Sequence, residues 1–360
     1  MRILHLPTDT GGNAHGLSRG ERLLGHSSDV LVAQASYLDY PADILLYNKL
    51  AGNRAQKLFR RLRYLQAFLR LRKAYDVFHF NFGTSLLHFP GFGLPGLELP
   101  FYDKKAKIAV TYNGCDARQK FPTMERNPHA PCHDPACYGG TCNSGRQDAI
   151  RAKAIDRMDA FANVIFALNP DLLYFLPERA VFLPYTIAGW DELIPAQSYE
   201  PSFPLRIVHA PTNRAAKGSD AVFAAVEILK KEQGDKIEFV LVENKTHKQA
   251  LKIYAGADLV IDQLRLGWYG GLAVEVMKLG KPVVAYIREE DLHFLPSDMA
   301  RDVLESFINA TEETLLDTLR TLVENPEILR QKSRAALEYV HRRHDPVLVA
   351  RQVTAAYENS

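Results

Sequence analysis

Short apolar runs alternate with longer segments of helical periodicity along the whole of this 360-residue chain. A few consecutive apolar residues bounded by turn residues indicate strands buried on both faces of a parallel sheet. In the first half of the chain this pattern predicts about six strands, at Arg2–Leu6, Asp29–Ala33, Val77–Phe80, Lys107–Tyr112, Val164–Leu168 and Ala180–Leu183. Strands and helices that alternate in this way predict a doubly wound sheet, whose ligands bind at the carboxyl ends of the strands.

The strand–helix pattern restarts after a proline-rich segment. Residues 188–204 contain Pro195, Pro201 and Pro204 and are typical of a linker. The strands expected beyond them are Leu205–Ala210, Ile237–Val242, Asp258–Asp262 and Pro282–Ile287. The prediction is an α/β protein of two doubly wound Rossmann-like domains, 1–187 and 205–344, that face a central cleft. Asp345-Pro346 begins a last helix (345–358), which we expect to pack back on the first domain.

Composition and charge narrow the classes of function. A formal charge of +2 gives no electrostatic argument for nucleic acid or for a strongly acidic partner. We find no apolar stretch long enough to span a membrane, and the start of the chain is too short and broken for a signal peptide. A cytoplasmic location is therefore expected.

The most informative stretch lies between the strands at 258–262 and 282–287. Gly270 and Gly271 stand where a loop turns into a helix, Glu275 follows one turn later, and Gly280 closes the helix. Glycines at a helix start let the backbone approach a ligand closely, and the free N–H groups there favour an anion. The alternative is a tight loop in which Glu275 only complements the helix dipole.

Two other loops follow strands of the predicted sheets. Arg214 and Lys217 stand three residues apart after the first strand of the second domain, and they are either a clamp on a diphosphate or a solvated surface pair. Gly11-Gly12 follows the first strand of the chain and is either a ligand loop or a plain turn. The spacing G-x-G-x-x-G occurs at Gly91–Gly96, but in a Pro- and Gly-rich segment and not directly after a predicted strand, and the P-loop lysine motif is absent, so nicotinamide and ATP fingerprints are not supported.

Residues 53–73 predict a basic amphipathic helix. Eight Lys and Arg residues are interleaved with apolar residues at helical spacing, and no acid intervenes. We expect the apolar stripe to cover the sheet, as in an ordinary helix. The one-signed charge is either a solvated face or a contact with an anionic membrane surface, worth about 1 kcal/mol per basic residue.

All four cysteines lie in one long loop, at Cys115, Cys132, Cys137 and Cys142. Their number predicts a structural zinc site, but their spacing is wider than in zinc ribbons and knuckles. Free thiols are the equal alternative, and oxidised pairs are disfavoured in a cytosolic chain.

Taken in order, these motifs resemble those of the retaining glycosyltransferases of family four, which have the B-type fold. The resemblance is strongest over Gly267–Val283, which is similar to the family's glutamate motif, and over Ile207–Gly218, which is similar to its strand and basic loop. The resemblance implies an acceptor-side first domain, a second domain that binds a nucleotide-sugar, and glycosyl transfer to a hydroxyl without a catalytic metal. The acceptor it implies is a glycan, which the basic helix suggests is lipid-linked or part of an envelope polysaccharide.

The resemblance also assigns roles to single residues. Arg214 and Lys217 would neutralise the diphosphate, Gly270 and Gly271 would donate N–H groups to it, and Glu275 would bind the ribose hydroxyls. Gly11 and Gly12 would form the first loop of the donor site, and Asp116 would contact the acceptor or the sugar. The first glutamate of the family's pair is replaced by Gly267. A nucleotide-sugar 2-epimerase of the same fold and a catalytically silent sugar-nucleotide-binding subunit are the alternative functions.

Overall fold

A computed structural model of the chain describes residues 1–48 and 54–360, without the side chains of residues 54, 55 and 57. Residue 53, the first of the predicted basic helix, lies outside the described residues. The chain divides into two compact units. The N-terminal unit comprises Met1–Gln119, Gly145–Ala188 and Asp345–Ser360, and the C-terminal unit comprises Lys120–Ser144 and Gly189–His344.

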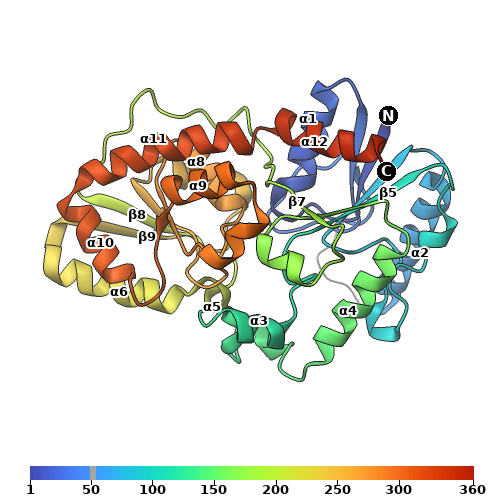
Figure 1. Cartoon of the computed structure of the whole chain (residues 1–360), viewed down its shortest axis with the longest axis horizontal. Coiled ribbons are helices and arrows are strands. Elements are labelled where there is room, and N and C mark those ends of the chain that lie inside the picture. Colours follow the sequence, from blue (N-terminus) through green and yellow to red (C-terminus); the bar gives the residue numbers. More distant parts are fainter. Residues whose placement is uncertain (49–53) are drawn as a thin grey trace. The chain divides into compact units, whose positions relative to one another are not determined.

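The described strands of the N-terminal unit form one parallel sheet with the order β3-β2-β1-β4-β5-β6-β7 (Figure 1). The strands are β1 (Arg2–Leu6), β2 (Ser27–Val32), β3 (Ile44–Leu45), β4 (Val77–Asn81), β5 (Lys107–Tyr112), β6 (Val164–Ala167) and β7 (Val181–Phe182). The six predicted strands are confirmed, and β3 adds a short edge strand that pairs with β2. It lies in the apolar run Ile44–Tyr47, which was not among the predicted strands.

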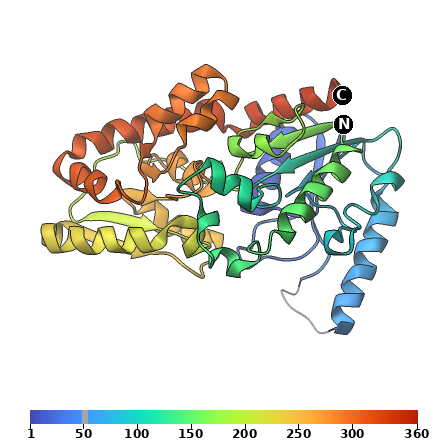
Figure 2. The ribbon, with the colours of Figure 1, turned by 60° about the horizontal axis from the view of Figure 1, so that its bottom comes forward.

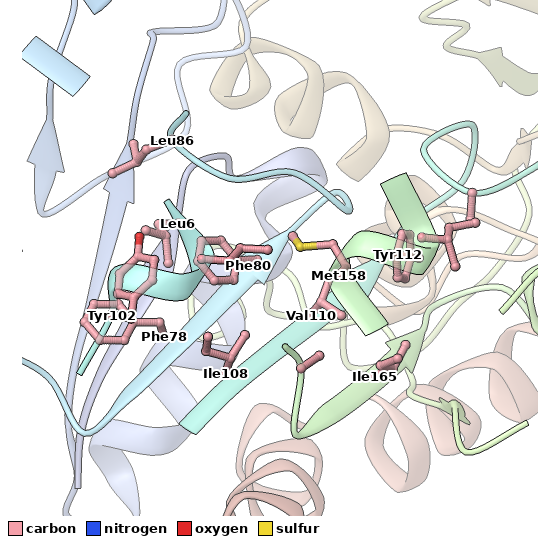
Figure 3. Close-up of a cluster of buried hydrophobic side chains, with 14 of the residues drawn as sticks. Leu6, Phe78, Phe80, Leu86, Tyr102, Ile108, Val110, Tyr112, Met158 and Ile165 are labelled. Carbon is pink, nitrogen blue, oxygen red and sulfur yellow. The ribbon is translucent and has the colours of Figure 1, made fainter. Parts of the chain in front are cut away.

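Helices cover this sheet because each central strand is buried on both faces. They are α1 (Asn13–Leu23), α2 (Arg54–Leu71), α4 (Arg146–Asp159) and α12 (Pro346–Glu358). Figure 3 shows the core beneath α4, where Met158 lies among Phe80, Val110 and Ile165. The last helix begins as predicted: the Asp345 side chain accepts hydrogen bonds from the N–H groups of Val347 and Leu348.

A buried polar network joins α12 to the N-terminal sheet. Tyr357 hydrogen-bonds to His79 Nδ1 at 2.6 Å and donates to Glu21 Oε1 at 3.3 Å. The other carboxylate oxygen of Glu21 bonds to His5 Nε2 and to the Ser28 hydroxyl, at 2.8 and 2.6 Å. Burial lowers the pKa of His79 well below its ordinary value. The last helix is thus fixed to α1 and to the centre of the sheet by hydrogen bonds as well as by packing.

The C-terminal unit holds a second parallel sheet, with the strand order β12-β11-β10-β8-β9 in the described chain. Its strands are β8 (Leu205–His209), β9 (Ile237–Leu241), β10 (Leu259–Ile261), β11 (Val283–Ala285) and β12 (Ile308–Asn309). Its helices are α3 (Lys120–Arg126), α5 (Arg214–Lys217), α6 (Ser219–Gln233), α7 (His247–Ala255), α8 (Gly271–Lys278), α9 (Ser297–Ser306), α10 (Leu315–Glu324) and α11 (Pro326–Arg343). The four predicted strands are confirmed, and β12 is again a two-residue strand that periodicity does not reveal.

The boundary between the units differs from the predicted one in two places. Residues 120–144, expected in the first domain, belong to the C-terminal unit, because Arg126 pairs with Asp291 and Asn127 donates to the Arg265 carbonyl. The segment 188–204 has no helix or strand, as expected for a linker, but most of it also packs on the C-terminal unit. Trp190 is buried there, with the Lys278 ammonium over its ring.

The network around α12 leads to a stability prediction. Tyr357→Phe removes one hydroxyl and leaves His79 and Glu21 buried without that partner, so the free energy of unfolding should fall by about 1–3 kcal/mol. Tyr37→Phe is the control, because that side chain is 51% exposed and should change stability by less than about 0.5 kcal/mol. Denaturant unfolding of both variants measures the difference, and equal losses would contradict the structural role of the network.

Candidate functional site

The candidate site of the C-terminal unit begins at the carboxyl end of β8. His209 ends the strand, and its ring hydrogen-bonds to the Ile261 carbonyl and the Ser219 hydroxyl, both at 2.8 Å. Burial lowers the pKa of His209 to about 4, so the ring is neutral near pH 7. The short helix α5 follows, capped by the Asn213 side chain, which accepts from the Ala216 N–H at 2.9 Å. This cap sets the direction in which Lys217 leaves the helix.

Asp262 is the centre of the site. Its side chain is fully buried, directly after β10. Oδ1 lies 2.5 Å from Lys217 Nζ, and Oδ2 accepts from the Gly270 N–H at 2.9 Å. One carboxylate therefore holds the lysine of the basic loop beside the turn that begins α8. The structure thus brings Lys217, Gly270 and Gly271 together, and it gives Asp262 a positioning role for Lys217.

Arg214 lies on the same short helix but has a different partner. Its guanidinium makes a two-point contact with Glu243, at 2.7 and 2.6 Å, and its side chain is 54% exposed. Hydrogen bonding to Arg214 lowers the pKa of Glu243. The two cations of the predicted clamp are thus on one turn, and only Lys217 is in contact with the residues around Gly270.

Glu275 lies on α8, buried, with His247 as its partner. His247 Nε2 hydrogen-bonds to Glu275 Oε1 at 2.6 Å from the first turn of α7. Burial raises the pKa of Glu275, and the hydrogen bond to His247 opposes that shift. The sequence analysis missed His247. Its one signal is the Thr246–Gln249 capping box, which begins a helix after a strand and can be read from the sequence.

Arg265 is a second residue that sequence reasoning missed. Its guanidinium bonds to Glu312 at 2.8 Å, to the Ala215 carbonyl at 2.8 Å and to Asp134 at 3.2 Å. It therefore connects the loop after β10 to α5 and to the cysteine-bearing segment 120–144. Nothing in the sequence around Arg265 indicates partners so distant along the chain.

The backbone at Gly267, where the resemblance would place a glutamate, disfavours any other residue. Gly267 has φ +79°, and a Cβ there would lie 2.9 Å from Arg288 Cβ. A glutamate at this position would be both strained and too close to Arg288. Tyr269, two residues on, is buried, with its hydroxyl 2.5 Å from that of Tyr339 and 3.0 Å from His344 Nε2. The loop before Gly270 is therefore fixed by the backbone conformation of Gly267 and by the hydrogen bonds of Tyr269.

The remaining predicted residues belong to the N-terminal unit. Gly11 and Gly12 form the turn between β1 and α1 with φ of +69° and +72°, and a Cβ on Gly12 would lie 2.8 Å from Ala188. Asp116 folds back on its own loop: its carboxylate accepts from the N–H groups of Asn113 and Gly114, at 3.0 and 2.6 Å. Burial raises the pKa of Asp116 to about 6.

A pocket of about 380 Å³ opens at the carboxyl ends of strands in the N-terminal unit. Its floor includes Pro7 after β1, Ala33 after β2 and Thr84 after β4. Arg60 and Arg61 of α2 line its other side. Two guanidinium groups beside a pocket at this edge of the sheet favour an anionic or polar ligand.

The cysteine loop does not form the zinc site that was one alternative for it. Cys115 belongs to the N-terminal unit, whereas Cys132, Cys137 and Cys142 belong to the C-terminal unit, and all four are partly exposed thiols. Among the described residues, no group of three or more His, Cys, Asp or Glu side chains is arranged to hold a metal ion. The predicted zinc site is therefore not formed by the described cysteines, and no disulfide joins them.

Comparisons with known proteins test the fold. No protein-family model matches the chain, and no curated protein sequence matches it. It is similar to the solved sucrose-phosphate synthase of Thermosynechococcus elongatus, with 15% identity and a TM-score of 0.60 over 100% of this chain and 99% of that one. It is similar to HepE of Anabaena, solved in complex with UDP-glucose, with 12% identity and a TM-score of 0.60 over 100% of both chains.

The chain has the GT-B fold. The predicted pair of Rossmann-like domains is thereby confirmed. GT-B proteins similar to this chain also include the UDP-GlcNAc 2-epimerase of Neisseria meningitidis, solved with UDP-GlcNAc, with 11% identity and a TM-score of 0.54 over 100% of both chains. Because one fold supports several activities, function has to be argued from the site.

The conformation of Gly267 leads to a stability prediction. Gly267→Ala should lower the free energy of unfolding by about 1–3 kcal/mol, because an L-residue is strained at positive φ and its Cβ would meet Arg288. The control is Gly91→Ala, where a Cβ meets nothing within 4 Å and φ is not in the left-handed region. Thermal or denaturant unfolding compares the two. An unchanged Gly267→Ala protein would mean that a side chain is tolerated there.

Proposed function

We propose that this protein transfers a glycosyl group from a nucleoside-diphosphate sugar to a hydroxyl of an acceptor, with retention at the anomeric carbon. The observation that carries the proposal is the contact of Lys217 and the Gly270 N–H with one buried carboxylate, at the start of α8. This contact holds the Lys217 ammonium and the N-terminus of α8 together at the carboxyl ends of the strands of the C-terminal sheet. That is where Rossmann-like domains bind phosphate groups.

The proposed reaction breaks the bond between the anomeric carbon and the diphosphate oxygen and forms a bond from that carbon to the acceptor oxygen. Negative charge develops on the departing diphosphate, so catalysis needs positive potential that is already in place. Lys217 has three N–H donors and uses one for Asp262, which leaves the others for phosphate oxygens. In this proposal the first-turn N–H groups of α8, including that of Gly271, supply the remaining positive potential at the diphosphate.

Arg214 completes the clamp in this proposal by exchanging Glu243 for the diphosphate. The Arg214–Glu243 pair is largely exposed, and such pairs add little to stability. A dianionic group beside Lys217 is therefore an effective competitor for the guanidinium. Before the diphosphate binds, the ion pair with Glu243 then orients the Arg214 side chain on the side of α5 where we place the diphosphate.

Glu275 and His247 bind the ribose in our proposal. A buried carboxylate held at one oxygen by His247 is a rigid acceptor for hydroxyl donors. We assign Gly11 and Gly12 to the first loop of the donor site, where a Cβ on Gly11 would meet nothing within 4 Å and glycine therefore leaves room for the ligand. A metal ion has no part in this mechanism.

We place the acceptor on the N-terminal unit, with Asp116 as a contact to the acceptor or the sugar. The pocket beside Arg60 and Arg61 favours an acceptor that carries an anionic group. A lipid-linked or envelope glycan that carries a phosphate group would have this chemistry. We therefore include a lipid-linked or envelope glycan as the acceptor in the proposal.

The clamp leads to a kinetic prediction. Lys217→Ala should lower turnover about 10²–10³-fold, because it removes one fixed charge at the leaving group. Lys252→Ala, on the exposed side of α7, is the matched control and should retain wild-type turnover. The readout is sugar release or transfer from a panel of nucleoside-diphosphate sugars, with thermal shift by each as the measure of binding.

Folding has to be separated from catalysis, because Lys217→Ala leaves Asp262 buried without its cation. The double variant Lys217→Met with Asp262→Asn removes both charges and should fold while remaining inactive. Wild-type turnover in either Lys217 variant would exclude the clamp.

The second candidate function is epimerisation of a nucleotide-sugar, favoured by the similarity to a 2-epimerase of the same fold. Incubation with the donor alone decides between the two, because only an epimerase converts the sugar without an acceptor. A silent sugar-nucleotide-binding subunit, suggested by the glycine at 267, would bind the donor in calorimetry but neither transfer nor convert it.

A further inference from the structure

Helix α2 carries two apolar rows. The inner row packs on the core of the N-terminal unit and consists of Tyr64, Ala67, Phe68 and Leu71. The outer row, Leu58, Leu62, Leu65 and Leu69, is exposed to 61, 56, 40 and 56%. At about 100° per residue, the outer row is centred about 140° from the inner one. The predicted apolar stripe therefore covers the sheet only in part, and an ordinary surface helix has no need of the outer row.

Basic side chains flank the outer row on both sides. Helical geometry puts Arg61 on one side and Arg63 and Arg70 on the other. Arg72 and Lys73 follow in the turn after the helix. Arg61 lies over the Phe89 ring at 5.3 Å, and Arg63 donates to the Leu46 carbonyl at 2.8 Å. Because an aromatic ring and a backbone carbonyl are uncharged, these contacts do not neutralise the two guanidinium groups. The sequence from Arg54 to Tyr75 contains no acid that would neutralise it.

A neighbouring loop adds further exposed apolar side chains. Phe92, Leu94, Leu97 and Phe101 are 79, 49, 42 and 58% exposed. The Arg61–Phe89 contact and a 3.1 Å hydrogen bond from Arg72 to the Phe101 carbonyl hold this loop beside α2. Figure 2 shows α2 at the periphery of the N-terminal unit, with this loop next to it. We call the outer leucine row, its flanking basic residues and Phe92–Phe101 the α2 surface.

We propose that the α2 surface docks this protein on a bilayer that contains anionic lipid. Leucine and phenylalanine side chains enter the boundary between headgroups and acyl chains, while the arginines and lysine meet lipid phosphates. Among the described residues, no helix is long and apolar enough to cross the bilayer. A second copy of the chain is a poorer occupant, because a two-fold interface would bring the same positive charges face to face. This proposal does not depend on the proposed transfer reaction.

Co-sedimentation with vesicles tests the proposal. The full chain should bind vesicles of phosphatidylcholine mixed with phosphatidylglycerol, bind phosphatidylcholine alone far more weakly, and dissociate as salt is raised. The triple variant Leu62→Ser, Leu65→Ser, Leu69→Ser should lower the affinity for the anionic vesicles about tenfold or more. Arg61→Gln with Arg70→Gln should lose a similar factor.

Matched controls keep the test independent of folding. Leu23→Ser removes a leucine that is 58% exposed on α1, and it should bind vesicles as the wild type does. All variants change outward-facing residues, so their thermal midpoints should match. Vesicle binding that is absent, unaffected by the α2 variants or equal on neutral lipid would overturn the proposal. A wild-type dimer that the leucine variant makes monomeric would overturn it too, by assigning the surface to self-association.

Discussion

One buried carboxylate organises the loops at the edge of the C-terminal sheet. A fully desolvated aspartate is tolerated only where charge and hydrogen bonds compensate its lost hydration. Asp262 obtains both, from the Lys217 ammonium and the Gly270 N–H, and these groups come from two different loops. The requirement to satisfy one charge therefore fixes the distance between the basic loop and the start of α8. A backbone bond from Leu264 to the Lys217 carbonyl, at 3.2 Å, supports the same arrangement.

The N-terminal unit uses a buried carboxylate for a different purpose. Glu21 is fully buried and bonds to His5, Ser28 and Tyr357, which belong to β1, β2 and α12. Its partners therefore include a helix that follows the whole C-terminal unit in the sequence. The first carboxylate fixes two loops at the edge of the C-terminal sheet, and the second fixes the last helix of the chain.

The α2 helix shows how one element can satisfy two environments. Its inner row contributes to the core, as in any helix on a sheet, whereas its outer row and flanking arginines have no such role. Exposed leucines are costly in water when they are gathered in one patch, so their grouping calls for a partner. The pocket beside Arg60 and Arg61 opens next to the same helix, which joins the proposed acceptor chemistry to the proposed membrane surface.

The α/β class, the two successive doubly wound domains, most of the strands and the start of the last helix could be predicted from the sequence. These follow from local features, namely apolar runs, turn residues and helix caps, which need no distant partner to be recognised. The sequence also singled out Lys217 and the Gly270 turn as candidates. The folded structure was needed to show that Asp262 contacts both, that His247 holds Glu275, and that Arg214 pairs with Glu243. It also assigned residues 120–144 to the second unit and turned four leucines of α2 outward. Each of these outcomes depends on contacts between residues far apart in the chain or on which face of a helix is covered, and periodicity carries no information about either.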